Sequence, residues 1–181
     1  MVGDYFDGGP VAHSFIKTGS TYAPLDDPAA TSIGTYASGI NKFGEVVGGF
    51  FGSGPHGFLY SGGTFTTLDD PSGGSTFAGG INDQHKIVGF FDDGLGEHGF
   101  ILKGGVYTTF DVPGASATDS VAINNEGQIA GYFTDASGDT HGFVATPTPE
   151  PAVWAMMLIG IFGVGSRLRS GRRRQTAAAA A

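Results

Sequence analysis

The sequence contains no cysteine, which excludes disulfide bonds, thiolate metal sites and cysteine nucleophiles. Charged residues are also scarce, at 14%. All 17 acidic residues lie in residues 1–150 beside only four lysines, so this part is strongly acidic. A nucleic-acid surface needs a positive field around the phosphates. We therefore expect no nucleic-acid binding.

The sequence also has no long segment with the 3.6-residue apolar period of an amphipathic helix in this acidic part. Glycine and proline, at 33 and 9 of 181 residues, make up almost a quarter of the chain. Hydrophobic residues still reach 40% and aromatic residues 12%, which is too much for a disordered chain. This composition predicts many short strands joined by tight turns.

An internal repeat of about 42 residues organises residues 1–145. One block, Ile-Asn followed by an apolar pair and glycine, occurs at residues 40–48, 81–89 and 123–131. A second block, His-Gly-Phe or His-Ser-Phe, begins at four histidines: His13, His56, His98 and His141. A third block runs from an aromatic residue to Asp-Pro or Val-Pro, at residues 22–28, 65–71 and 107–113. Three blocks recurring in the same order establish the repeat.

Each unit is predicted to contain four short strands, with boundaries near 2–46, 47–87, 88–129 and a partial unit at 130–145. In the strand around His56, alternation places His56, Phe58 and Tyr60 on one face. Asn41 and Gly44 are typical of a type I turn, so the fourth strand should form a hairpin with the first strand of the next unit. His85 replaces that glycine in one unit, and histidine tolerates a positive φ there.

Four strands in about 42 residues are typical of a β-propeller blade. The predicted fold is therefore all-β, a β-propeller-like array or a partial propeller, because three and a half units are fewer than a usual ring. Pairing with another chain and an open β-solenoid remain alternatives. Met1 falls inside an expected first strand, and no basic and apolar secretory signal precedes it, so we expect the natural start to lie upstream.

The C-terminal 35 residues differ in composition from the repeats. Residues 146–151 form a proline-rich linker, residues 152–168 are uncharged up to Arg167, and residues 169–181 form a basic tail. An apolar run closed by arginines predicts a single transmembrane helix with its basic end in the cytoplasm. The flanking arginines are Arg167, Arg169, Arg172, Arg173 and Arg174.

This C-terminal segment resembles the PEP-CTERM sorting signal, in Pro149-Glu150-Pro151, in the apolar run that includes Trp154, and in the arginine cluster. The resemblance implies an exosortase, a membrane-embedded cysteine protease, as partner. It also implies export, brief anchoring in the inner membrane, and delivery to the envelope, surface or exterior of a Gram-negative bacterium, often one that makes exopolysaccharide. The repeats resemble those of HAF-repeat extracellular proteins. Neither resemblance names a ligand.

The four repeat histidines are predicted to be structural, because a metal site would require them to converge on one point. We expect each imidazole to hydrogen-bond a carboxylate or a carbonyl between strands. The aspartates that recur in register are the natural partners: Asp26, Asp69 and Asp111. The turn asparagines recur in the same way: Asn41, Asn82 and Asn124.

No cofactor is predicted. The acidic loops at 7–9, 92–97 and 135–139 could offer oxygens to Ca2+, but solvated turns explain them better. No Gly-x-Ser-x-Gly nucleophile elbow is present. Tyr22, Phe65 and Tyr107 could stack on sugars, although such positions more often pack between sheets.

The predicted function is therefore a non-catalytic exported surface or matrix protein, associated with biofilm or exopolysaccharide. A carbohydrate-binding module is the alternative. A metal-dependent hydrolase is the weakest hypothesis, since only His85 breaks the repeat among the polar residues.

Overall fold

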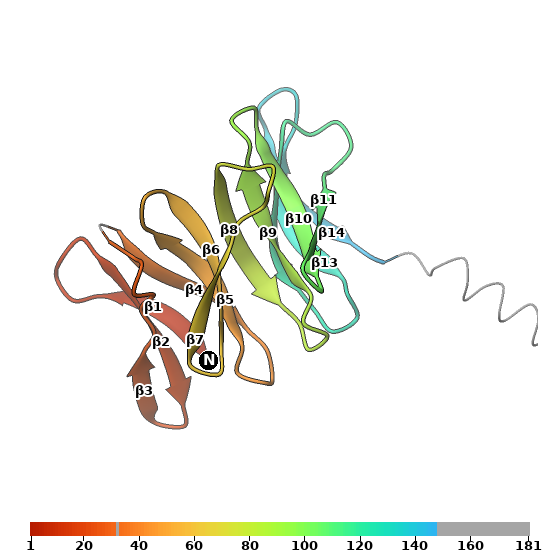
Figure 1. Ribbon diagram of the computed structural model, residues 1–181. Coiled ribbons are helices and arrows are strands. Elements are labelled where there is room, and N and C mark those ends of the chain that lie inside the picture. The colour runs from red at the N-terminus through yellow and green to blue at the C-terminus, as the bar shows by residue number, and fades with distance from the viewer. Residues whose placement is uncertain (32, 148–181) are drawn as a thin grey trace, which may run out of the picture. The chain divides into compact units, whose positions relative to one another are not determined.

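The computed structural model describes residues 1–31 and 33–147, and every regular element over these residues is a β-strand (Figure 1). The all-β prediction is confirmed. The strands follow one another as four antiparallel meanders, in chain order. Glycine-rich turns alternate with strands rich in β-branched and aromatic residues, which suits short, partly buried strands.

The two complete meanders have four strands each, and the first and fourth have three. The first contains β1 (Val2–Phe6), β2 (Ala12–Thr18) and β3 (Thr21–Pro24). The second contains β4 (Gly34–Ile40), β5 (Val46–Phe51), β6 (Pro55–Ser61) and β7 (Thr64–Leu68). The third contains β8 (Ser75–Ile81), β9 (Ile87–Asp92), β10 (Glu97–Lys103) and β11 (Val106–Phe110). The fourth contains β12 (Ala117–Ile123), β13 (Ile129–Thr134) and β14 (Thr140–Ala145).

A single parallel contact joins the first two meanders into one seven-stranded sheet. It pairs Ala12 with Gly34, and the Ala12 amide donates to the carbonyl of Ile33 at 2.8 Å. Gly34 has a φ of 104°, and a Cβ there would overlap the backbone of Ala12. Only glycine permits this approach of the two chains. The described residues thus form three hydrogen-bonded sheets built from four meanders.

The turn chemistry read from the sequence is confirmed at the hairpins. The Gly44 amide donates to the Asn41 carbonyl at 3.1 Å, and β4 and β5 pair on either side of that turn. His85 takes the place of this glycine with a φ of 56°, and its amide makes the same 3.1 Å bond to Asn82. The turn therefore persists in the left-handed region, as expected for histidine.

The hydrogen-bonded meanders are offset by one strand from the sequence repeat. The expected unit 47–87 contains β5, β6, β7 and β8, but β8 pairs with β9 and not with β7. Each strand predicted to end a unit therefore opens the next meander. A bulge recurs in this opening strand, between Ala37 and Gly39, Ala78 and Gly80, and Ser120 and Ala122.

The core lies between successive meanders, which stack face to face. We call the side of each meander that contacts the next one its leading face, and the opposite side its receiving face. Val47 and Leu59 of the second leading face share a cluster with Phe91 and Phe100 of the third receiving face. Ile16 of the first meander likewise packs against the cluster that contains Phe58. The same stacking is thus used repeatedly to bury apolar side chains.

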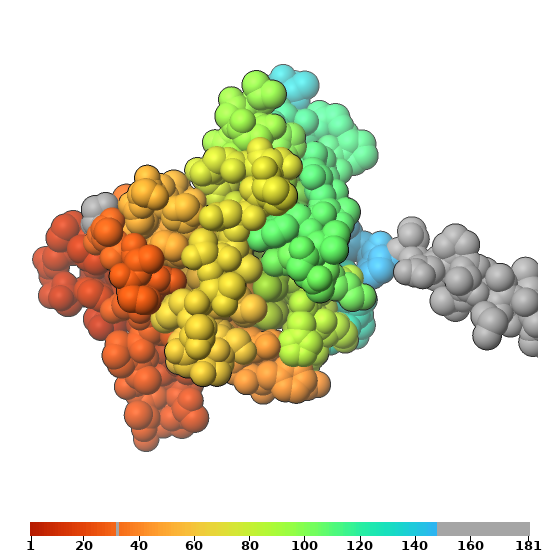
Figure 2. Space-filling model, viewed as in Figure 1, coloured from red at the N-terminus to blue at the C-terminus, as the bar shows by residue number. Residues whose placement is uncertain are grey.

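The described body does not close into a ring. The first meander lies at one end of the stack and the fourth at the other (Figures 1 and 2). Among the residues that the structure describes, the first receiving face and the fourth leading face have no meander packed against them.

Candidate functional site

Each of the first three repeat histidines hydrogen-bonds the aspartate that the sequence suggested. The Nδ1 atom lies 2.9 Å from Asp26 for His13, 2.9 Å from Asp69 for His56 and 3.0 Å from Asp111 for His98. Histidine stands near the start of the middle strand, and aspartate follows the end of the next strand. The pair therefore ties together the open end of a hairpin.

A cross-strand aromatic ring fixes the other side of each imidazole. His13 lies 5.4 Å from Tyr5 and His56 lies 5.2 Å from Phe50, measured between ring centroids. His98 lies 5.4 Å from Phe91, and His141 lies 5.1 Å from Phe133. The carboxylate and the aromatic ring hold the imidazole in place, so the histidine stabilises the pairing of neighbouring strands.

The carboxylate neighbours change how two of these histidines titrate. The hydrogen bond to Asp111 raises the pKa of His98, against a smaller opposing effect of desolvation, and the charge of Asp93 adds to the rise. The hydrogen bond to Asp26 raises the pKa of His13 in the same way. A higher pKa favours imidazolium, which cannot bind a metal.

His141 departs from this pattern. Its Nε2 atom lies 2.9 Å from Asp135 in the preceding turn. This bond lowers the pKa of Asp135, and the amides of Asp139 and Ser137 that donate to the same carboxylate lower it further. The pairing is therefore local to one hairpin.

The acidic loops use their carboxylates within their own turns. Asp92 accepts from the Gly94 amide at 2.7 Å, Asp93 from Leu95 at 2.8 Å, and Asp135 from Ser137 at 2.8 Å. These are Asx turns, in which a side-chain oxygen replaces a backbone acceptor. Within residues 1–31 and 33–147, no group of three or more His, Asp and Glu side chains is arranged to hold a metal ion.

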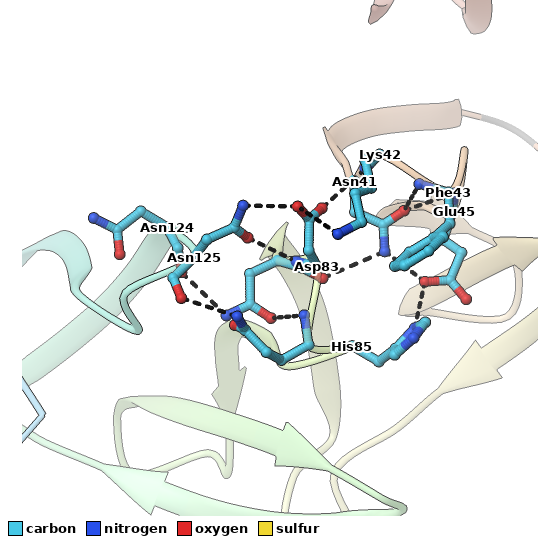
Figure 3. Close-up of polar contacts among 10 residues, drawn as sticks. Asn41, Lys42, Phe43, Glu45, Asp83, His85, Asn124 and Asn125 are labelled. Atoms are coloured by element: carbon cyan, nitrogen blue, oxygen red, sulfur yellow. Dashed lines mark hydrogen bonds and ion pairs between the residues drawn. The ribbon is translucent and has the colours of Figure 1, made fainter.

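The recurring asparagines form a ladder that joins the meanders (Figure 3). Each side-chain oxygen accepts two amides of its own turn, as Asn82 does from Gln84 and Lys86 at 3.0 Å each. The side-chain nitrogen then donates to the next turn, from Asn41 to the Asn82 carbonyl at 3.3 Å and from Asn82 to the Asn124 carbonyl at 3.1 Å. One residue type therefore both closes a turn and joins neighbouring repeats.

A second set of contacts in the same turns was not predicted from the sequence. Asp83 accepts the Lys42 amide at 3.0 Å, and its own amide donates to Asn125 at 2.9 Å (Figure 3). The Lys42 amide is the main cause of the lowered pKa of Asp83, and the Asn125 amide group and the Lys42 charge contribute. The sequence signal was the polar residue that follows each turn asparagine.

His85, the one polar deviation noted in the sequence, is another inter-meander contact. Its Nδ1 atom lies 2.7 Å from Glu45, and its ring stacks on Phe43 at 5.2 Å between centroids (Figure 3). The imidazole therefore reaches the second meander from a turn in which His85 has a positive φ. The deviation is thus explained by a contact between repeats.

Of the three aromatic residues considered for sugar stacking, only Tyr22 is exposed, at 58% of its surface. Phe65 packs against Phe58 and Tyr107 against Phe100, because another meander covers their faces. Tyr22 lines an open pocket of about 400 Å³ with Tyr5, Phe15, Ala23 and Pro24. It is an apolar, aromatic pocket at one end of the stack.

No protein-family model matches this chain, and a search of the curated proteins gave no match.

Asp119 is a buried carboxylate that was not predicted from the sequence, although a position-by-position comparison of the repeats could have found it. It occupies the position of Tyr36 and Phe77 in the earlier meanders and is only 3% exposed. Burial, together with the charge of Glu97, raises its pKa to about 6. The hydroxyl of the neighbouring Ser120 is buried without a hydrogen-bond partner. This is the most unusual polar position within the described residues.

The sorting residues Pro149, Glu150 and Pro151, the segment 152–168 and the five arginines lie outside the described residues. Over residues 1–31 and 33–147, no helix has the length and apolar character needed to cross a membrane. The predicted transmembrane helix and its sorting role stay predictions.

Proposed function

We propose that this protein is a non-catalytic scaffold of the bacterial surface or extracellular matrix. The observation that carries the proposal is the use of the recurring polar residues. The histidines bond within hairpins, and the asparagines bond within turns and between meanders. Groups held this way stabilise a platform, and the recurrence of the same pair in successive repeats fits a structural role better than a single catalytic site.

We further propose that the stack is a partial β-propeller. Four antiparallel meanders follow one another in chain order, and each of the first three packs against the meander that follows it. A bulge in each opening strand and small residues at Gly39 and Gly80 let neighbouring opening strands approach closely. These features match stacked blades.

The proposed route to the surface depends on the C-terminal sorting residues. An exosortase would cleave near Pro149-Glu150-Pro151 while residues 152–168 hold the chain in the inner membrane. The repeat domain would then be released to the envelope or matrix, with exopolysaccharide as a neighbour. The acidic repeats and basic tail on opposite sides of the apolar run support this orientation.

The test is processing of the full chain, fused to a cleavable secretion signal, in a bacterium that has an exosortase. The starting chain should give a shorter, released form, and Glu150→Ala should leave the longer form in the membrane fraction. Asp139→Ala, in an exposed loop, is the matched control and should be processed normally. Equal processing of the Glu150→Ala variant would reject the route.

A carbohydrate-binding module is the second candidate, favoured by the Tyr5–Phe15–Tyr22 pocket. Exposed tyrosines suit stacking on sugar rings. Titration of the chain with bacterial exopolysaccharide should then show micromolar to millimolar affinity that Tyr22→Ala lowers. Phe43→Ala, at an exposed ring in a turn, is the control. Equal binding by the two variants would remove this pocket from consideration.

A further inference from the structure

We propose that the leading face of the fourth meander binds the receiving face of the first meander in a second copy of this chain. Copies would then associate head to tail, and their interface would continue the stacking that each copy already contains. The inference does not depend on the export route, and it assigns to a second copy the Tyr5–Tyr22 surface that the carbohydrate-binding alternative would use.

The receiving end presents aromatic side chains that are covered elsewhere in the stack. Tyr5 is 44% exposed, whereas Phe50 and Phe91 at the equivalent position are each 3% exposed. Tyr22 is 58% exposed, whereas Phe65 and Tyr107 are partly buried in inter-meander clusters. Both differences in exposed fraction have the same cause: a preceding meander is packed on each of the later receiving faces.

The leading end presents the complementary apolar positions. Val144 is 70% exposed, but the equivalent Leu59 packs against a core cluster. Tyr132 is 44% exposed, whereas the equivalent Gly49 is buried. Val144 and Ala130 also line a depression of about 280 Å³. An apolar surface of this kind, left open by the described repeats, is the kind of face that a neighbouring repeat covers.

At each internal interface, a leading face packs on a receiving face. The two open faces are one of each kind, so a leading face of one copy fits the receiving face of a second copy. Leu59 and Tyr107, equivalent to Val144 and Tyr22, pack against one cluster between the second and third meanders. At the corresponding interface between copies, Val144 and Tyr22 would pack into one shared apolar cluster. Because two different faces meet, the contact is heterologous and leads to a ring or to an open filament.

The interface between copies must be smaller than the internal ones, because β1, β2 and β3 correspond to β5, β6 and β7 and the described first meander has no opening strand. Val121 and Ala122 stand where the third meander has Gly79 and Gly80, whose backbones approach the fourth meander closely. The described residues of the second copy offer no opening strand for Val121 and Ala122 to meet. We therefore expect reversible association, dependent on protein concentration and carried by the outer strands.

The test uses the absence of native cysteine, which makes introduced thiols unique. Full-length Tyr22→Cys and Val144→Cys chains are mixed in equal amounts and treated with a short bismaleimide. Covalent dimers containing one copy of each variant are expected. The control replaces Val144→Cys with Leu95→Cys, a loop position that is 94% exposed. Melting curves of each variant check that the fold is retained.

The dimer yield in the mixture of Tyr22→Cys and Val144→Cys chains should exceed the yield in the control mixture. Adding Tyr132→Lys to the Val144→Cys chain places a charge in the contact and should lower the dimer yield about tenfold. Equal yields in the two mixtures would overturn the proposal. Dimers formed by Tyr22→Cys alone at the same yield would also overturn it, because that face would then pair with itself. Binding of exopolysaccharide without cross-linking would assign the face to sugar instead.

Discussion

At the scale of single residues, the most informative side chain is Asp119, which carries a carboxyl where two other repeats carry an aromatic ring. Its folded pKa of about 6 lies above the unfolded value near 3.8. The folded state therefore binds the proton more tightly. The contribution of Asp119 is fully favourable below about pH 4 and is lost as the pH rises through about 6.

Replacing Asp119→Asn should therefore stabilise the protein at pH 7.5 and have almost no effect at pH 3.5. We expect a gain of about 1–2 kcal/mol at pH 7.5, less than a full two-unit shift implies, because nearby water screens the charge. Denaturant unfolding at the two pH values measures this difference. Asp139→Asn, in an exposed loop, is the control, and an Asp119→Asn effect independent of pH would contradict the argument.

The His98–Asp111 pair gives a second prediction at this scale. Asp111→Asn removes the carboxylate that is the largest cause of the raised pKa of His98. The pKa of His98 should then fall toward 6.5, while that of His13, which depends on Asp26, should stay raised. A histidine NMR titration of both proteins reads the two values separately. A His98 pKa that does not respond to the substitution would reject the assigned cause.

At the scale of elements, the asparagine turn is the unit that links hairpins. Asn82 is 3% exposed, and its side-chain oxygen accepts two backbone amides while its nitrogen reaches the fourth meander. Asn124 makes the same two acceptor bonds in an exposed turn. The two turns therefore differ in burial and in the bond to the next meander, since the Asn124 nitrogen donates within its own turn.

Asn82→Ala should lower the free energy of unfolding by about 1–3 kcal/mol, because it leaves two part-buried backbone amides and the Asn124 carbonyl without their partner. Asn124→Ala should cost about 1 kcal/mol or less, since water can replace the lost acceptor. Chemical denaturation of both variants measures the difference. Equal losses would show that the ladder between meanders contributes nothing beyond its turns.

At the scale of the whole molecule, stability should depend on position in the stack. Phe100 is fully buried between meanders, whereas Phe143 at the equivalent position of the fourth meander is partly exposed. Phe143 contacts Phe110 of the third meander, but among the described residues no strand follows β14 to cover it as β11, through Tyr107, covers Phe100.

Phe100→Ala should therefore destabilise the protein by about 3–5 kcal/mol, the usual cost of removing a buried ring, and Phe143→Ala by clearly less. Thermal and denaturant unfolding of the two variants provide the comparison. The reverse order would show that the fourth meander, and not the inner part of the stack, limits stability.

Much of the local structure could be predicted from the sequence because it depends on short-range chemistry. Asn41 and Gly44 predicted the hairpin between β4 and β5, and the thirteen-residue separation of His56 and Asp69 matches their observed bond. The side-chain partners of Asp83 and Glu45 could not be predicted, because they come from repeats about 40 residues away.

The sequence by itself determined the strands, their turns and their recurrence, because alternation, glycine and asparagine act over a few residues. Only the tertiary structure decided which strand begins a sheet, since a repeat has the same period whatever its phase. It also decided which aromatic side chains remain exposed, and that Asp119 is buried. These properties depend on which faces stack, and equivalent residues such as Tyr22 and Tyr107 differ in burial only because a neighbouring meander covers one of them.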